Sequence, residues 1–175
     1  MANSIFEKLT KDKINFNVYF AGDDSCYLDV KYDKQPIDLL GDYLDSEHYF
    51  NATCINKKGA VVGHVDFDIM DTKAVSLGEI RVDRRYRHKG YGSKLLRFVD
   101  LVARDSGLNK IEGMFSPDDF DKGLIFYARN GYEYSNASGA NYIYKTVDKT
   151  QDFSDLVIDF PEAQVDFEID KEVNI

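Results

Sequence analysis

The chain has 175 residues, 43% hydrophobic and 14% aromatic, which is enough to enclose one substantial core and argues against global disorder. Its 22 basic and 31 acidic residues give a formal net charge of −9, which opposes nucleic-acid binding and mildly favours a cationic or amine partner, although acidic surfaces also serve solubility. No apolar run reaches the ~18 residues of a membrane span, and the N-terminus lacks the apolar core of a signal peptide, so we expect a soluble, cytoplasmic protein without a membrane partner.

The first half of the chain predicts an antiparallel sheet. Alternating apolar residues between turn-forming segments predict four strands, at 15–21, 26–32, 49–55 and 60–69. Turn-prone residues 22–25 lie between the first and second strands, and turn-prone residues 56–59 lie between the third and fourth. Each of these two pairs of strands is therefore expected to form a hairpin. A short helix is predicted over 37–43.

The second half alternates strands and helices. The predicted elements are a strand at 76–82, a helix at 90–105, a strand at 110–116, a helix at 120–129 and a hairpin at 132–147 that is broken near 136–139. The apolar spacing of Leu95, Val99, Val102 and Ala103 gives the first helix one buried face.

The C-terminal segment is chemically distinct. Residues 148–175 carry nine acids and two bases, a net charge of −7, against −2 for the 147 residues before them. We therefore divide the chain into a domain over 1–147 and an acidic extension over 148–175. The apolar residues at 156–160 and the alternation of Val165, Phe167 and Ile169 favour an extended hairpin or edge strand, with a flexible acidic tail as the alternative.

Cysteine and histidine spacing gives no sign of a metal site. Cys26 and Cys54 form no CxxC pair, so buried or incidental thiols are the preferred interpretation. His48, His64 and His88 do not form ligand spacings with the carboxylates, and no metal is predicted.

The segment 83–92 carries the chemistry. Four basic residues cluster here in an otherwise acidic protein, just before a predicted helix that begins with Gly90, Tyr91 and Gly92. A helix N-terminus exposes unpaired N–H groups and the positive end of the helix dipole, and glycines let a phosphate approach the backbone. The dinucleotide fingerprint fails because residue 95 is Leu, and the P-loop ending Gly-Lys-Ser/Thr is missing. The alternative is that the glycines and arginines only form a solvated turn.

The segment resembles the signature of the GNAT superfamily of acyl-CoA-dependent N-acetyltransferases. Its pattern R-x-x-G-x-G/A is present as Arg87-His88-Lys89-Gly90-Tyr91-Gly92, after a strand and the lead-in from Val82 to Tyr86. A second family feature is present as Phe126-Tyr127-Ala128-Arg129-Asn130-Gly131-Tyr132. The similarity runs from about Val61 to about Lys145, roughly half of the chain.

The resemblance implies a fold, a cofactor and a binding site. The implied fold is a three-layer α/β fold with a mostly antiparallel sheet and one parallel strand-helix-strand unit. Acetyl-CoA is the implied cosubstrate, with its pantetheine arm along the backbone of Ile80 and Val82. The implied cofactor-binding residues in the loop and helices are Arg87, His88, Lys89, Gly90, Tyr91, Gly92, Ser93 and Gly123.

The implied reaction is attack of a primary amine on the thioester, the amine belonging to a small molecule, a peptide N-terminus or a lysine. Tyr127 holds the position of the family's acid for the departing thiolate, although it also suits simple aromatic packing. Glu79 is the candidate base, and a surface pair with Arg81 is its competing interpretation. Further candidate bases are Asp66 and Asp68, whereas structural or backbone roles are preferred for His64 and His88.

One position departs from the family. Where its members often have Asn, this chain has Phe120, which removes a polar contact to the distal part of the cofactor; Asp118, Asp119 and Asp121 are candidates to compensate or to reach a cationic substrate.

Two other functions stay open. One is a non-catalytic acyl-CoA-binding module. The other is that the acidic extension adds a strand to the sheet of a protein partner or of a second subunit, giving a homodimer.

Overall fold

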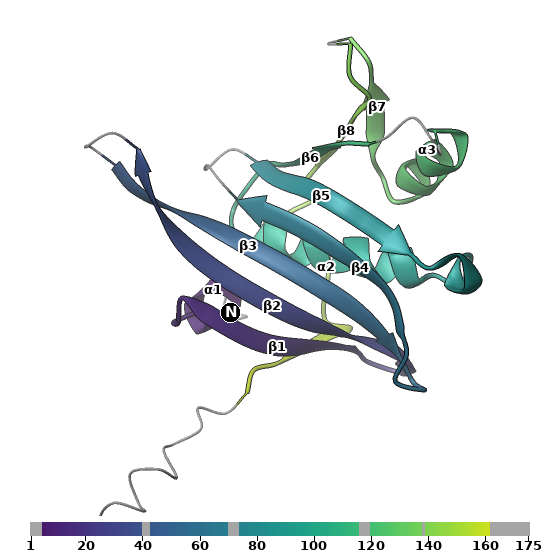
Figure 1. Cartoon of the computed structure of the whole chain (residues 1–175), viewed down its shortest axis with the longest axis horizontal. Helices are drawn as coiled ribbons and strands as arrows, with labels where there is room; N and C mark the ends of the chain where they lie inside the picture. The colour runs from purple at the N-terminus through teal and green to yellow at the C-terminus, as the bar shows by residue number, and fades with distance from the viewer. Residues whose placement is uncertain (1–4, 40–42, 70–73, 116–119, 138, 162–175) are drawn as a thin grey trace, which may run out of the picture.

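The computed structural model describes residues 5–39, 43–69, 74–115, 120–137 and 139–161 (Figure 1). The described elements are α1 (Ile5–Lys8), β1 (Lys13–Phe20), β2 (Asp23–Leu39), β3 (Tyr43–Asn56), β4 (Val61–Ile69), β5 (Ala74–Val82), the 3₁₀ helix η1 (Arg84–Tyr86), α2 (Tyr91–Asp105), β6 (Lys110–Met114), α3 (Phe120–Arg129), β7 (Glu133–Ser135), β8 (Tyr142–Thr146) and β9 (Leu156–Asp159). No helix within these ranges is long and apolar enough to cross a membrane.

The strands form one sheet in the order β7-β8-β6-β5-β4-β3-β2-β1-β9. Among the described pairs, β5 and β6 run parallel and the others antiparallel. Because parallel neighbours need a crossover, α2 connects β5 to β6 across one face of the sheet. The expected α/β class is confirmed, with a mixed, mostly antiparallel sheet and one parallel strand-helix-strand unit.

The helix predicted at 37–43 is wrong. Ile37 and Leu39 belong to β2 and pair with Asp45 and Tyr43 of β3. The β2–β3 ladder continues to the pair of Leu39 with Tyr43, and its hydrogen bonds override the weak local preference for a helix. Residues 40–42 of the predicted helix lie outside the described residues.

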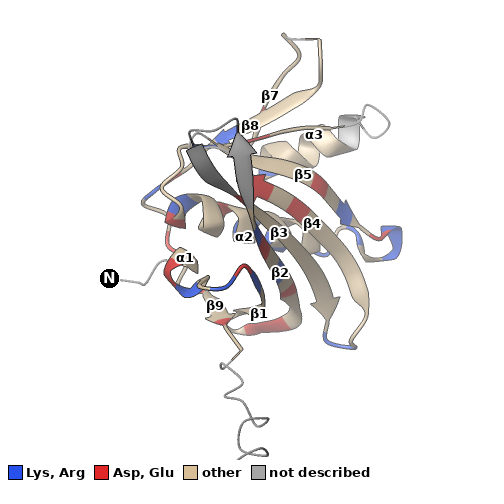
Figure 2. Ribbon diagram, turned by 60° about the vertical axis from the view of Figure 1, so that its left-hand side comes forward, with Lys and Arg blue, Asp and Glu red and all other residues tan. Residues whose placement is uncertain are grey.

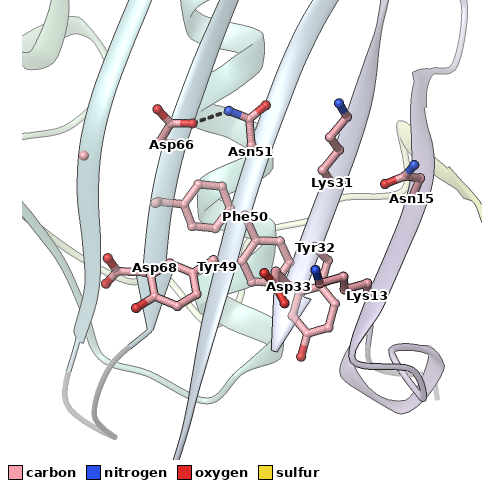
Figure 3. A pocket seen from close by; sticks show the side chains of 12 residues that line it. Lys13, Asn15, Lys31, Tyr32, Asp33, Tyr49, Phe50, Asn51, Asp66 and Asp68 are labelled. Atoms are coloured by element: carbon pink, nitrogen blue, oxygen red, sulfur yellow. Dashed lines mark hydrogen bonds between the residues drawn. The ribbon is translucent and has the colours of Figure 1, made fainter. Parts of the chain in front are cut away.

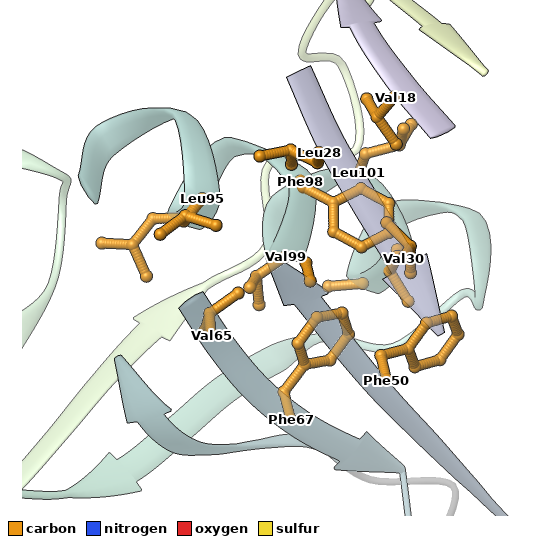
Figure 4. Packing of buried hydrophobic residues seen from close by; sticks show 14 of the residues in the cluster. Val18, Leu28, Val30, Phe50, Val65, Phe67, Leu95, Phe98, Val99 and Leu101 are labelled. Carbon is orange, nitrogen blue, oxygen red and sulfur yellow. The ribbon is translucent and has the colours of Figure 1, made fainter. Parts of the chain in front are cut away.

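The core lies between α2 and one face of the sheet (Figure 4). Phe98 of α2 is fully buried, and its ring meets those of Phe16, Phe50 and Phe67 edge-on at centroid distances of 6.1, 6.3 and 5.8 Å. Phe50 and Phe67 stack on each other at 4.9 Å. These rings belong to β1, β3 and β4, so a single helix side chain ties three strands together. Cys26 and Cys54 are buried free thiols, as expected.

The opposite face of β1 to β4 carries polar side chains. Its residues alternate with the core residues, and no described helix covers them. Figure 2 shows acidic positions interspersed along these strands. This surface is called the open face below.

The described part of the acidic extension is built into the fold. β9 pairs antiparallel with β1, and Phe153 is buried beneath the guanidinium groups of Arg97 and Arg104, at 4.9 and 4.6 Å from its centroid. Arg97 Nε also donates to Asp155 Oδ2 at 2.9 Å. The edge strand expected within 156–160 is therefore present as β9. The alternation at residues 165–169 lies outside the described residues, and the boundary at 147/148 stays a prediction.

We expect Phe98→Ala to lower the free energy of unfolding by about 3–5 kcal/mol, because it removes a fully buried ring shared by three strands. Urea denaturation followed by circular dichroism measures this change. Val61→Ala is the control, since Val61 is 62% exposed and its truncation should cost less than about 0.5 kcal/mol. Equal losses in both variants would contradict the assignment of the core.

Candidate active site

The site begins where β5 and β6 separate. Their parallel pairing ends at Leu77 and Gly113, whereas β5 continues to Val82. Residues 78–82 therefore have no strand partner on the β6 side within the described part of the chain. At about 3.3 Å per residue, they leave ~16 Å of strand edge unpaired.

A β-bulge reshapes β5 at this point. Val65 pairs with Ile80 and Phe67 with Leu77, so that Gly78 and Glu79 together oppose the single residue Asp66. Strict alternation from the buried Leu77 would turn residue 79 toward the core. The extra residue shifts the alternation by one and places Glu79 on the open face, as bulges commonly re-aim a side chain.

The backbone groups along the unpaired edge alternate in direction. Asp83 N donates to Val62 O at 2.9 Å, so the N–H and C=O of Arg81 also face β4 and those of Ile80 and Val82 face the β6 side. Arg87 Nε donates to Val82 O at 2.9 Å, which agrees with this direction. The backbone groups of Ile80 and Val82 are thus directed toward the separation between the strands.

The loop after β5 leads to the N-terminus of α2. Asp83 caps η1 by accepting from Arg85 N at 3.0 Å, and then His88 and Gly90 adopt left-handed φ angles of 65° and 85°. Left-handed residues in a loop turn successive N–H groups toward one side, and α2 adds the unpaired N–H groups of its first turn. The loop cations are exposed, so the site combines backbone donors, a helix dipole and positive charge.

Gly92 allows α3 to pack against the start of α2. A Cβ on this buried glycine would lie 2.9 Å from the Phe126 ring and 3.6 Å from Val82 Cγ2. Next to Phe126, the Tyr127 ring packs among Phe126, Phe115 and Tyr132, at centroid distances of 5.3, 5.7 and 5.6 Å. Burial raises the pKa of Tyr127 to about 12.

A partly buried ion pair supports this aromatic cluster. Lys145 Nζ donates to Asp100 at 3.0 Å and to Asn130 O at 2.9 Å, and lies 5.5 Å from the centre of the Tyr132 ring. These contacts tie β8 to α2 and to the end of α3. The Tyr132 hydroxyl is buried without a hydrogen-bond partner among the described residues, and desolvation raises its pKa well above the usual value.

On the open face, Glu79 lies beside His64 and Asp66. His64 Nε2 and Glu79 Oε2 are 3.4 Å apart, and one ligand atom from each of the three residues falls within 4.8 Å of the others. Arg81 is more distant, at 3.9 Å from Glu79. Three such groups could hold a divalent cation, and the predicted absence of a metal stays a prediction. Sequence spacing missed this group, although the period of two already places His64 and Asp66 on one face.

A family model described as Acetyltransferase (GNAT) family matches residues 14–132, more than half of the chain. The chain belongs to this GNAT acetyltransferase family. No curated protein matches it.

Solved GNAT structures are similar to this chain in fold. An acetyltransferase of the GNAT family from Staphylococcus aureus Mu50 is 21% identical, with a TM-score of 0.51 over 57% of this chain and 69% of that chain. PaiA N-acetyltransferase from Thermoplasma acidophilum, in complex with coenzyme A, is 17% identical, with a TM-score of 0.51 over 56% and 60%. An acetyltransferase from Streptococcus agalactiae 2603 is 18% identical, with a TM-score of 0.50 over 56% and 66%. At these identities the likeness shows the fold alone.

Most of the residues predicted from the GNAT signature lie along one continuous part of the structure. Ile80 and Val82 lie on the unpaired edge, and the loop continues directly into the helix start, through Arg87, His88, Lys89, Gly90, Tyr91, Gly92 and Ser93. Gly123 lies in α3 beside the Phe115 ring. Tyr127 is on the side of the sheet that carries α2, whereas Glu79 is on the open face. The side chains of residues 118–121 lie outside the described part, so their predicted roles stay predictions.

We expect Gly92→Val to destabilise the protein by about 1–3 kcal/mol, because its side chain would overlap the Phe126 ring. Ser93→Val is the matched control, since Ser93 is the next residue of the same helix and is exposed. Chemical denaturation of both variants gives the comparison. If Gly92→Val is no less stable than Ser93→Val, α3 does not pack on Gly92 as described.

Proposed function

We propose that this GNAT protein transfers an acetyl group from acetyl-CoA to a primary amine by direct attack, with Glu79 as the general base and Tyr127 as the general acid. The observation that carries the proposal is the continuous set of backbone groups formed by the unpaired edge of β5 and the start of α2. An extended pantetheine arm carries amides that can pair with such an edge, in the manner of an added strand. The pyrophosphate suits the exposed N–H groups, the dipole and the loop cations.

The proposed base and the proposed acid lie on opposite faces of the sheet. A thioester between β5 and β6 would be reached by the amine from the open face, where Glu79 removes a proton from the ammonium. The amine nitrogen then bonds to the acetyl carbon, the carbon–sulfur bond breaks, and Tyr127 gives its proton to the leaving thiolate. The second proton that the nitrogen loses on becoming an amide passes through water to the Tyr127 phenolate, which restores the acid. The products are the N-acetylated amine and coenzyme A. The PaiA complex with coenzyme A supports this assignment at the level of the fold.

We further propose that the protein is cytoplasmic and has no nucleic-acid or membrane partner. A peptide N-terminus or a lysine is the alternative acceptor, and a second subunit is proposed to bind through the acidic extension.

Tyr127→Phe is expected to lower kcat for acetylation of hexylamine about a hundredfold, because it removes the proposed proton donor. Release of free thiol measures turnover, and calorimetry should show a Kd for acetyl-CoA within about twofold of the native value, since the ring is retained. A raised pKa keeps the hydroxyl protonated below it, so the native rate should lose this donor only as pH rises toward about 12.

Two results would speak against the proposal. Unchanged kcat in the Phe variant would remove the acid role from Tyr127. Binding of acetyl-CoA without turnover of any amine by the native chain would favour the non-catalytic acyl-CoA-binding module instead.

A further inference from the structure

A hollow of about 440 Å³ crosses the open face from β1 to the bulge in β5 (Figure 3). Its end at β5 is formed by Gly78, whose lack of a side chain leaves room beside the Asp66 carbonyl. A Cβ at this position would lie 3.0 Å from that oxygen. The hollow therefore extends to the strand edge that the proposed function assigns to the thioester.

The strand register arranges the floor of the hollow in two polar rows. In the first row Asp66 pairs with Asn51, Asn51 with Lys31 and Lys31 with Asn15. The second row consists of Asp68, Tyr49, Asp33 and Lys13 in the same order of strands. Since neighbouring strands lie about 4.8 Å apart, the backbone positions of Asp66 and Lys31 are separated by ~10 Å.

The end of the hollow at β4 is acidic and incompletely paired. Asp66 accepts a hydrogen bond from Asn51 and lies within 4.8 Å of Glu79. Asp68 Oδ1 is buried and has no hydrogen-bond partner among the described residues. Burial, with a smaller contribution from Glu47, raises the pKa of Asp68. A buried acceptor without a donor is costly, and an ammonium group supplies both donors and charge.

The other end, on β1 and β2, is basic. Lys13 has a residue of opposite charge, Asp33, as its cross-strand partner, whereas Lys31 has the neutral partners Asn15 and Asn51. Within the described residues no ion pair to Lys31 is found, and its side chain is exposed. The ammonium group of Lys31 is thus available to an anion, and its flexible stem lets it follow ligands of somewhat different length.

We propose that this hollow is the acceptor site and that the acceptor is a primary amine carrying an anionic group, a carboxylate or phosphate, at its far end. The amine lies at Asp66 and Asp68, next to Glu79, and the anion lies at Lys31. The assignment of the reacting end rests on the proposed function, because that function places the thioester beside Glu79. A diamine would bring its second cation to Lys31, and a plain alkylamine would leave Lys31 unpaired.

Three amines of equal chain length test this charge pattern: 6-aminohexanoate, hexylamine and 1,6-diaminohexane. We expect kcat/KM for 6-aminohexanoate to exceed the values for the other two amines about fivefold, which is the effect of a solvent-accessible ion pair. Lys31→Met should bring the ratio of 6-aminohexanoate to hexylamine close to one. Lys34→Met is the matched control, since Lys34 is an exposed lysine of the same strand whose side chain alternates to the opposite face, and it should preserve the ratio.

Binding separates this inference from the proposed function. Calorimetry of 6-aminohexanoate, with the protein saturated by coenzyme A so that no transfer occurs, should give an affinity that falls about fivefold in Lys31→Met and in Asp66→Asn but not in Lys34→Met. Binding of this kind, together with no acetylation of any amine when acetyl-CoA is supplied, would overturn the transferase proposal. The charge pattern proposed for the hollow would still be supported. Preference for hexylamine or the diamine, or binding that Lys31→Met does not weaken, would overturn the inference even if amines are acetylated.

Discussion

The separation of β5 from β6 after Leu77 and Gly113 is the constraint on which the site depends. Backbone N–H and C=O groups in a sheet are normally paired, so an unpaired strand edge inside a fold must be satisfied by water, a side chain or a ligand. Here the bulge opposite Asp66 turns the end of β5, and Arg87 donates to the Val82 carbonyl at its far end. The same bulge brings Glu79 to the open face. One local irregularity thus provides both a docking edge and a candidate base.

The sheet separates two chemically different surfaces. On one side, Phe98 and the rest of α2 form the core, and the N-terminus of α2 presents donors beside α3. On the other side, polar residues line a hollow with acids at β4 and a lysine at β2. The proposed reaction uses both surfaces, since cofactor and acceptor would meet only at the unpaired edge. This arrangement would keep the cationic loop and the acidic acceptor end on separate elements, so that each attracts its own substrate.

The sequence predicted the elements that depend on local signals. The glycines at 90 and 92, the basic loop and the apolar spacing of Leu95 to Val102 were sufficient for α2 and its phosphate-binding context. The helix wrongly predicted from residue 37 shows the opposite case, because pairing with β3 determines the structure of residues 37–39 and no local sequence pattern indicates that pairing. The neighbours of Glu79 could not be predicted either. They depend on a two-against-one register between β4 and β5, and the row from Asp66 to Lys31 depends on the alignment of two hairpins.

Hydrogen exchange of individual backbone amides, measured with and without coenzyme A, tests whether the cofactor binds along the unpaired edge of β5. We predict slower exchange on binding for Ile80, Val82 and residues 91–93, whose N–H groups face the proposed ligand. Arg81 serves as an internal control, because its N–H already faces β4 and should show little change. Protection that is confined to other strands, or that is the same at Arg81 as at its two neighbours, would contradict binding of the cofactor along this edge.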